Sequence, residues 1–426
     1  MKICFIVCQG NMYSGGQGVY LHYVSGELAR LGHEVHVIAG RPYPEVAEGV
    51  HLHKLKTFSF WSFLDGRDEY VFETNPLLFF HPLNLYEFAS TRVNLASLLL
   101  MFSLRAYAKL NELERDGPFD LIHDNQNLGY GVLLMKARGR PVVANIHHPL
   151  AIDRHNDLAQ TKALRHRIGR IVWYPWLMQR LVAHRIDRII TGSATSAGSV
   201  QEAFGLPRER IAVIHDGVDT EIFRPLEEVE PEQGSILFVG NSEDRNKGAR
   251  YLLQALGLLQ YDVDFRLTLV DRKRKDLKVV PPLVWKYGLT RLVEYTGHLS
   301  TPELVRQYNR AQVLVSPSLY EGFGLPAAEA MACGVPVIAT RAGALPEVVE
   351  DGVTGLLVPP ADPQALAEAI RRLLSDPELC RRMGRAGRQR IVERFTWRET
   401  ARRTLDLYHD VLSGQREARS AGRSAP

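Results

Sequence analysis

Two glutamates flank a glycine turn in the segment Ser316–Val337, which has the sequence SPSLYEGFGLPAAEAMACGVPV. Glu321 directly precedes the turn, and the helix expected after it carries Glu329 about one turn from its start. Glycines let backbone N–H groups approach a ligand, and a helix start offers unpaired donors with a partial positive charge. The segment therefore suits a phosphate-bearing ligand, with one carboxylate facing a sugar and the other a ribose. A structural strand–turn–helix corner with acids near the helix start fits the spacing equally well.

Three further segments carry residues suited to the same chemistry. Lys247 precedes Gly248 in a loop after a predicted strand, where its ammonium can pair with a diphosphate; a solvated loop lysine is the alternative. His147 ends the predicted strand PVVANIH, and a histidine there can donate a hydrogen bond or move a proton; a structural histidine is the alternative. Gly15 and Gly16 would let a loop lie against a phosphate. That loop lacks the GxGxxG pattern, which disfavours a dinucleotide site.

The elements that would position these residues alternate between short β-branched runs and amphipathic helices. Such alternation predicts βαβ units and parallel sheets, an α/β fold. The pattern restarts after Glu227–Gln233, a stretch of acids, proline and glutamine. We therefore expect two wound, Rossmann-like domains, residues 1–215 and 216–395.

Two parts of the chain do not follow this alternation. Residues 58–107 are aromatic and irregular, and are expected to be either an insertion beside a cleft or an extension of the core. Residues 413–426 are small, polar and basic, which predicts a disordered tail.

Several motifs, in order, resemble those of the retaining glycosyltransferases of family 4. The segment around Glu321 and Glu329 resembles the family's donor-site signature, and Ile214–Pro225 (IHDGVDTEIFRP) its interdomain hinge. The pairs Val239-Gly240 and Lys247-Gly248 resemble the phosphate-contacting loop. The segments GGQG, GELARLGHEVHV and GALPEVVEDGVTGLL are also similar. Residues 58–107 and the last ~15 residues lie outside the resemblance.

The resemblance implies a GT-B architecture, in which two Rossmann-like domains face each other across a cleft. The last helix, about residues 396–412, would cross back onto the first domain. It also implies roles for individual residues. Glu321 would bind donor-sugar hydroxyls and steady charge at the anomeric centre, Glu329 would hold the ribose, and Lys247 would pair with the pyrophosphate. His147 would lie near the donor sugar and act with Glu321 and Lys247 in catalysis. Other donor contacts are implied for Gly15, Gly16, Asn241, Arg245, His298, Gly322, Phe323, Gly324 and Leu325.

One position departs from the family pattern. The family usually has arginine directly after the Val-Gly pair, whereas this chain has Asn241, which is neutral and cannot form a bidentate fork. The loop is also one residue longer. We expect Arg245 to replace the missing charge.

The implied reaction transfers a sugar from a UDP-, GDP- or ADP-linked donor to a hydroxyl of a glycan, lipid-linked or small-molecule acceptor, with retention of configuration. An epimerase acting on nucleotide-sugars shares the fold and the donor site. A phosphorylase would need a cofactor-lysine motif, which is not evident. A non-catalytic carbohydrate- or membrane-binding protein is the rival of another class, although Glu321 and Lys247 are both present.

No metal or other cofactor is expected, because Lys247 and a helix start already serve the phosphates. Asp262-Val263-Asp264 has the DxD form that binds metal in another glycosyltransferase fold, but a solvated strand entrance explains it better. Residues 154–188 mix seven Arg and one Lys with aromatic residues, a pattern that suits an anionic membrane surface or a lipid-linked acceptor. An ordinary solvated helix face explains the same pattern.

Composition bounds the remaining possibilities. The 426 residues include 52 Lys and Arg against 48 Asp and Glu, a balance that gives no argument for nucleic acid. The longest apolar run, residues 95–104, is shorter than the ~20 residues of a membrane-spanning helix. The four cysteines form no CxxC pair, and the apolar N-terminus is too short for a signal segment. We therefore expect a cytoplasmic protein, with contact to the inner membrane face through residues 154–188.

Overall fold

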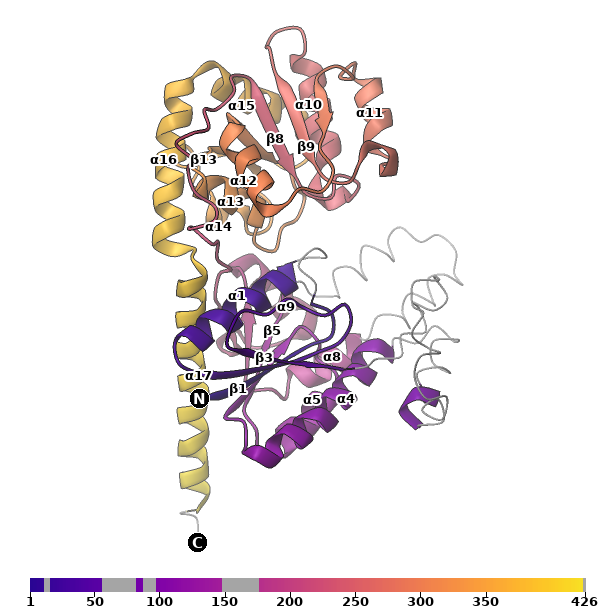
Figure 1. Ribbon diagram of the computed structural model, residues 1–426, viewed down its shortest axis with the longest axis vertical. Coiled ribbons are helices and arrows are strands. Elements are labelled where there is room, and N and C mark those ends of the chain that lie inside the picture. Colours follow the sequence, from indigo (N-terminus) through magenta and orange to yellow (C-terminus); the bar gives the residue numbers. More distant parts are fainter. Residues whose placement is uncertain (11–15, 56–81, 87–96, 148–175, 424–426) are drawn as a thin grey trace. The chain divides into compact units, whose positions relative to one another are not determined.

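The computed structural model describes residues 1–10, 16–55, 82–86, 97–147 and 176–423. Gly15 and residues 154–175 of the basic-aromatic segment lie outside the described residues. The chain forms two compact units, each built around one parallel sheet (Figure 1). Unit 1 comprises Met1–Gly192, Ser196–Ile214 and Ala401–Pro426, and unit 2 comprises Ser193–Thr195 and His215–Thr400.

The sheet of unit 1 has the strand order β3-β2-β1-β4-β5-β6-β7. Its neighbouring strands pair in parallel, as the βαβ alternation predicts. The strands are β1 (Lys2–Val7), β2 (Glu34–Ala39), β3 (Val50–Lys54), β4 (Leu121–Asn125), β5 (Val142–Asn145), β6 (Arg188–Thr191) and β7 (Ile211–Val213).

Helices cover both faces of this sheet, which explains why its central strands are apolar on both sides. One face packs on α4 (Ser97–Leu113), α5 (Tyr130–Ala137), α8 (Trp176–Ala183) and α9 (Ala194–Phe204). The other face lies beside α1 (Gly16–Arg30) and α17 (Trp397–Arg423), where Tyr20 and Tyr408 both contact the ring of His123. Residues 97–107 are therefore core helix in unit 1, because Met101, Phe102 and Ala106 are buried in α4.

The last helix, α17, joins unit 1 from Ala401 onward. The Tyr408 hydroxyl lies 2.5 Å from Nδ1 of His123, which is buried on β4. The helix runs to Arg423, so the predicted end at residue 412 and the disordered tail predicted from residue 413 are wrong as far as residue 423. Residues 415–423 contain Gln, Arg, Glu and Ala, which favour helix and allow the preceding turns to continue.

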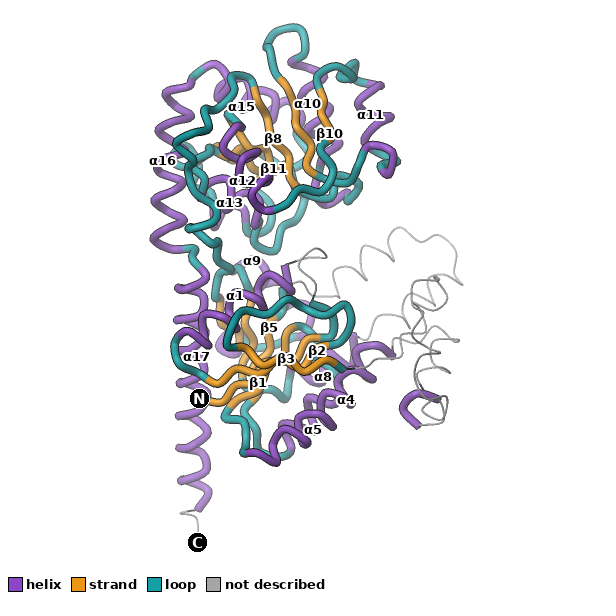
Figure 2. Tube along the Cα trace, viewed as in Figure 1, coloured by secondary structure: helices purple, strands orange, loops and turns teal. Residues whose placement is uncertain are grey.

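The sheet of unit 2 has the order β10-β9-β8-β11-β12-β13, and its neighbouring strands also pair in parallel. Figure 2 shows its strands in orange, with β8, β10 and β11 labelled. Its strands are β8 (Ser235–Val239), β9 (Arg266–Val270), β10 (Val293–Tyr295), β11 (Val313–Ser316), β12 (Val337–Thr340) and β13 (Gly355–Val358). In every strand of this sheet except β10, whose Glu294 is exposed, neighbouring residues enter two separate apolar cores, so those strands are buried on both faces.

One core of unit 2 contains α10 (Ala249–Leu259), α11 (Val280–Lys286), α15 (Pro363–Ser375) and the first half of α16 (Pro377–Arg394). The other contains α12 (Thr301–Arg310), α13 (Leu325–Ala332), α14 (Leu345–Val348) and the end of α16. No helix among the described residues is long and apolar enough to span a membrane.

Each sheet has one point at which its strand order reverses direction. In unit 1 this point lies between β1 and β4, and in unit 2 between β8 and β11. Ligands of doubly wound sheets bind beyond the carboxyl ends of the strands at such a point. The loops after β8 and β11 carry Lys247 and Glu321, so the sheet order brings these two residues together from sequence positions 74 apart.

Candidate functional site

An ion pair joins the two loops at the reversal point of unit 2. The Lys247 ammonium donates to both carboxylate oxygens of Glu321, at 2.8 and 3.0 Å. The Ser318 hydroxyl donates to Oε1 of the same carboxylate at 2.9 Å. Glu321 is 8% exposed, whereas the Lys247 side chain is 29% exposed. The carboxylate is therefore held from two sides, and the lysine keeps access to a ligand.

Close backbone approaches fix the geometry of this pair. Gly248 has a positive φ of 67°, and a Cβ atom there would lie 1.9 Å from the carbonyl oxygen of Pro317. The N–H of Leu319 donates to the carbonyl of Asn246 at 2.7 Å, so the two loops are hydrogen-bonded directly. Gly343, at φ +56°, gives the same close approach to the backbone of Glu321. The glycine at 343 begins the GALPEVV motif, whose contribution to this site was not expected from the sequence.

Glu329 lies on α13, the helix that begins directly after the glycine turn. The Tyr308 hydroxyl donates to its Oε2 at 2.6 Å. Burial raises the pKa of Glu329 to about 7, although the hydrogen bond from Tyr308 opposes that rise. The carboxyl group is therefore poised to change its charge near neutral pH.

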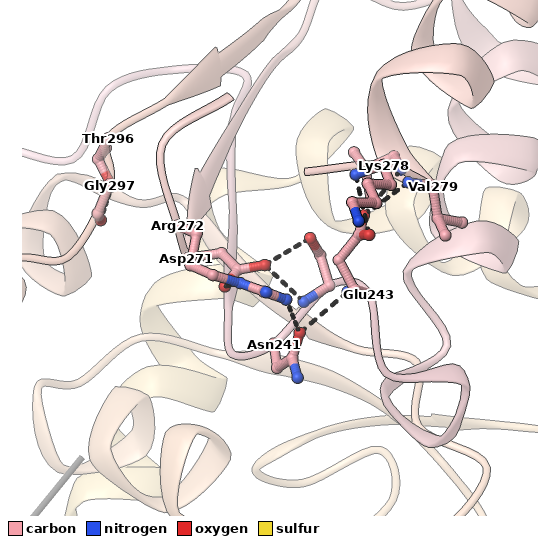
Figure 3. Close-up of polar contacts among 10 residues, drawn as sticks. Asn241, Glu243, Asp271, Arg272, Lys278, Val279, Thr296 and Gly297 are labelled. Carbon is pink, nitrogen blue, oxygen red and sulfur yellow. Dashed lines mark hydrogen bonds and ion pairs between the residues drawn. The ribbon is translucent and has the colours of Figure 1, made fainter. Parts of the chain in front are cut away.

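A polar cluster closes the carboxyl ends of β8 and β9 (Figure 3). Nη2 of Arg272 donates to Oδ1 of Asn241 at 2.8 Å. Oδ2 of Asp271 accepts from the N–H and the hydroxyl of Ser242, at 2.7 and 2.6 Å. Asn241 is thus bonded to an arginine from the neighbouring strand end, a contact that no sequence motif predicts. The available signal was the position of Arg272, two residues after a predicted strand.

Arg245 lies in a different environment. It begins the 3-10 turn Arg245–Lys247 and is exposed. It lines a cavity of about 400 Å³ with Arg250, Val279 and Leu283, on the side of α11, whereas Lys247 and Glu321 line a separate small cavity. Near that first cavity, the Glu243 carboxylate accepts the N–H groups of residues 278–280 at the start of α11 (Figure 3). Partial burial opposes the effect of these bonds, but together with nearby Arg272 they leave the pKa of Glu243 lowered.

The remaining residues expected in unit 2 lie on the loops after β10 and β11. His298 is exposed and follows Gly297, whose backbone lies beside Lys273 of the β9 loop. Phe323 is buried against Phe395, so only its backbone is available to a ligand. Gly322, Gly324 and Leu325 form the turn and the helix start beside Glu321.

In unit 1, Gly16 begins α1 and His147 follows β5, so both lie near carboxyl strand ends. Nε2 of His147 lies 2.9 Å from Oδ1 of Asn125. The same nitrogen lies 3.3 Å from Nδ2 of Asn145, so an amide acceptor and an amide donor are both within reach of Nε2. Burial lowers the pKa of His147 to about 4. At neutral pH it is therefore an uncharged hydrogen-bonding group.

The turn after β4 supports His147 with an unusual backbone. Gln126 and Leu128 have positive φ angles of 61° and 49°, a conformation that costs energy for side chains other than glycine. The buried Asp124 carboxyl holds this turn by accepting the N–H groups of Asn127 and Leu128, and burial raises its pKa to about 7 despite those bonds. Oε1 of Gln126 then accepts the N–H of His147 at 2.9 Å. No motif in the sequence predicts this support.

The DxD-like pair lies away from these residues. Asp262 precedes β9 and forms an ion pair with Arg371 at 3.3 Å, and Asp264 is exposed. Both are at the amino end of β9, the edge of the sheet opposite to Lys247 and Glu321. The structure therefore supports the interpretation of this pair as a solvated strand entrance.

Comparisons with known proteins match both units. Residues 14–222 match the model of Glycosyltransferase Family 4, and residues 219–390 match that of Glycosyl transferases group 1. The MMP alpha-(1->4)-mannosyltransferase of Mycolicibacterium hassiacum is 36% identical over 97% of this chain and 99% of that relative. The chain belongs to glycosyltransferase family 4.

Solved structures match the whole fold as well. The sucrose-phosphate synthase of Thermosynechococcus elongatus aligns over 97% of this chain and all of that one, with a TM-score of 0.73 and 23% identity. Anabaena HepE, solved in complex with UDP, covers 96% of this chain and 100% of its own, with a TM-score of 0.68 and 18% identity. These matches confirm the predicted GT-B fold class, and the family assignment makes this glycosyltransferase a transferase of glycan biosynthesis.

Proposed function

We propose that this glycosyltransferase moves a hexosyl group from a nucleotide-sugar to an acceptor hydroxyl and retains the anomeric configuration. The observation that carries the proposal is the Lys247–Glu321 ion pair at the reversal point between β8 and β11. It sets a cation and a hydrogen-bond acceptor side by side where a doubly wound sheet binds its ligand. A diphosphate attached to a sugar offers the complementary anion and hydroxyl groups.

In this proposal the Lys247 ammonium leaves Glu321 to neutralise the diphosphate of the donor. It stabilises the negative charge that develops as the bond between the anomeric carbon and the phosphate oxygen breaks. The N-terminus of α13 adds unpaired N–H donors to the same anion. The Glu321 carboxylate, oriented by Ser318, then accepts hydrogen bonds from the sugar hydroxyls and faces the cationic charge at the anomeric carbon.

The acceptor oxygen attacks on the face that the phosphate leaves. One bond, from the anomeric carbon to the acceptor oxygen, replaces the bond to phosphate, and the acceptor proton passes to a phosphate oxygen. Such a step needs no protein nucleophile and retains the configuration. Glu329 holds the ribose, and the neutral His147 contributes a hydrogen bond to the transferred sugar.

The similarity to known proteins narrows the choice of donors to test. Mannose is the first sugar to test, since the 36% identical relative is named a mannosyltransferase. UDP, GDP and ADP are all to be compared as the nucleotide, because HepE was solved with UDP but is only 18% identical. The acceptor hydroxyl belongs to a glycan, a lipid-linked sugar or a small molecule.

The test is a transfer assay with each nucleotide-sugar and a panel of hydroxyl acceptors, followed by NMR of the product. We expect the anomeric configuration of the product to match that of the donor. The transfer rate should be unchanged by EDTA, and transfer should be lost in Glu321→Ala. An inverted product would contradict the retaining mechanism. Conversion of the donor sugar to its 2-epimer without an acceptor would establish the epimerase instead. Binding of saccharides without any turnover would favour the non-catalytic protein.

A further inference from the structure

The first residue beyond Gly240, the glycine that follows β8, is neutral in this chain. Asn241 follows Gly240 and is exposed at the carboxyl edge of the unit 2 sheet. In the same loop, Lys247 is paired with Glu321, so its charge is already balanced before any ligand binds. A diphosphate carries more negative charge than one lysine compensates. A second cation near the end of β8 would complete the site.

Arg272 occupies that position from the neighbouring strand. It follows β9 by two residues, and its Nη2 donates to Oδ1 of Asn241 at 2.8 Å (Figure 3). Its Nε lies 3.7 Å from Oδ1 of Asp271, which is the one carboxylate in contact with it among the described residues. The side chain is 41% exposed. A guanidinium has five N–H donors, so these contacts orient the group and leave donors for an anion.

The two acidic residues near Arg272, Asp271 and Glu243, also accept backbone hydrogen bonds. Oδ2 of Asp271 accepts from the backbone and hydroxyl of Ser242, which ties the β9 loop to the β8 loop. The Glu243 carboxylate is held by the backbone N–H groups of residues 278–280. Neither loop can therefore move away from the other without breaking these hydrogen bonds, of which the two between Ser242 and Asp271 are buried. The Arg272–Asn241 contact is thus built on a fixed support.

Arg245, the residue expected to replace the missing charge, is placed differently. It lines the 400 Å³ cavity beside α11, whereas Lys247 and Glu321 line another cavity. Among the described residues no hydrogen bond or ion pair joins Arg245 to Asn241, and Arg245 begins the 3-10 turn Arg245–Lys247. The contact at Asn241 is made by Arg272 instead.

We propose that Arg272 binds the diphosphate of the nucleotide-sugar, with Asn241 as the positioning residue that holds its guanidinium. This inference rests on the proposed function and names the second cation of the same site. The planar fork of arginine matches two phosphate oxygens, which a lysine cannot do. The chain therefore takes its second phosphate ligand from β9 and not from the loop after β8.

The experiment is calorimetric titration of the wild-type protein with UDP, GDP and ADP, and then with the monophosphate and nucleoside of whichever binds. Arg272→Ala should lower the affinity for the nucleoside diphosphate by about 10- to 100-fold, the effect of losing charge-assisted hydrogen bonds. The affinity for the nucleoside should change by less than twofold. Arg272→Lys should recover only part of the loss. Arg245→Ala, which removes the same charge, is the matched control and should change the diphosphate affinity by less than twofold.

The outcomes separate the two proposals. Wild-type protein that binds no nucleotide would overturn the proposed function and this inference together. Diphosphate binding that survives Arg272→Ala, or that is lost in Arg245→Ala instead, would overturn this inference alone. An equal loss for diphosphate and nucleoside would also overturn it, since Arg272 would then contact the base. Asn241→Ala should lower the affinity for the nucleoside diphosphate less than Arg272→Ala does. In the double variant it should lower the affinity little beyond the effect of Arg272→Ala alone, as a positioning role requires.

Discussion

The carboxyl edges of the two sheets use opposite chemistry. Unit 2 places charged groups there. The side chains of Lys247 and Arg272 are partly exposed, and the buried Glu321 carboxylate is paired with Lys247. Unit 1 places uncharged groups there, since burial keeps His147 neutral and surrounds it with the amides of Asn125 and Asn145. The same strand–loop–helix topology thus presents an ionic surface in one unit and a neutral hydrogen-bonding surface in the other.

This difference indicates how the work of a transferase is divided. Charged side chains suit a diphosphate, whose binding must offset the loss of its hydration. Neutral histidine and amide groups suit hydroxyls, because they can donate or accept without attracting counter-ions. We therefore expect variants of unit 2 to change nucleotide affinity and charge stabilisation, and variants of unit 1 to change turnover alone.

The largest effect is expected from Glu321→Gln. Loss of the carboxylate that faces the anomeric charge should lower kcat by about 100- to 1,000-fold, as for removal of one electrostatic stabiliser. The affinity for the free nucleoside diphosphate should stay the same or rise, since Lys247 no longer has a carboxylate partner. Steady-state kinetics and calorimetry measure the two quantities. A parallel loss of nucleotide affinity would contradict the assignment of Glu321 to the sugar.

The second effect concerns stability at the same edge. Gly248→Ala forces a side chain into a left-handed backbone and within 1.9 Å of the Pro317 carbonyl. Gly352→Ala is the matched control, with φ +76° and no atom within 4 Å, so it reports the backbone cost alone, roughly 1–2 kcal/mol. We expect the melting temperature to fall clearly further for Gly248→Ala. Equal decreases would mean that the loop shifts without cost and that the pair is not rigidly held.

The third effect tests the neutral edge of unit 1. His147→Ala should lower kcat/KM by about tenfold, the value of one hydrogen bond in a site sheltered from water. The Kd of the nucleoside diphosphate should not change. The control is Glu202→Ala, a substitution at an exposed position of α9 in unit 1, whose kinetics should match the wild type. A higher Kd of the nucleoside diphosphate in His147→Ala would contradict the assignment of nucleotide binding to unit 2 alone.

The smallest effect is a pH dependence. Burial places the pKa of Glu329 near 7, compared with an ordinary value of 4.5, so the carboxylate that accepts ribose hydroxyls forms as pH rises through 7. Nucleotide affinity should therefore increase several-fold between pH 6 and pH 8. Glu329→Gln should reduce this increase to the part that comes from the phosphate itself. A pH profile identical in the two proteins would exclude the ribose role of Glu329.

The sequence predicts most of the fold because its strands are short, apolar and bounded by glycine or polar loops. The predicted run 265–270 is β9 within one residue, and the predicted run 313–316 matches β11. The core helix at 97–113 was harder to recognise, since the aromatic residues before it interrupt the alternation. The helical continuation after residue 412 was also missed, because small and charged residues favour both disorder and helix.

The sequence predicts those site residues that lie close together in one motif. It does not predict those that meet only because strands distant in sequence pair. Glu321 and Glu329 lie in one motif, and Lys247 stands in a recognisable loop. Arg272 meets Asn241 only because β9 pairs with β8, and the two are 31 positions apart. Tyr308, which bonds Glu329, shows the same problem at 21 positions. Proximity of this kind follows from sheet order, which the sequence alone left open.

The most direct test of the account is thermal stabilisation of the wild-type protein and Lys247→Ala by UDP, GDP and ADP. A ligand at 100 times its Kd adds roughly 2.7 kcal/mol to the free energy of unfolding, which a melting curve resolves. We predict that one of the three raises the melting temperature of the wild type and that Lys247→Ala loses most of that rise. Equal stabilisation of both proteins, or none by any nucleotide, would contradict the placement of the donor diphosphate at the charged edge of unit 2.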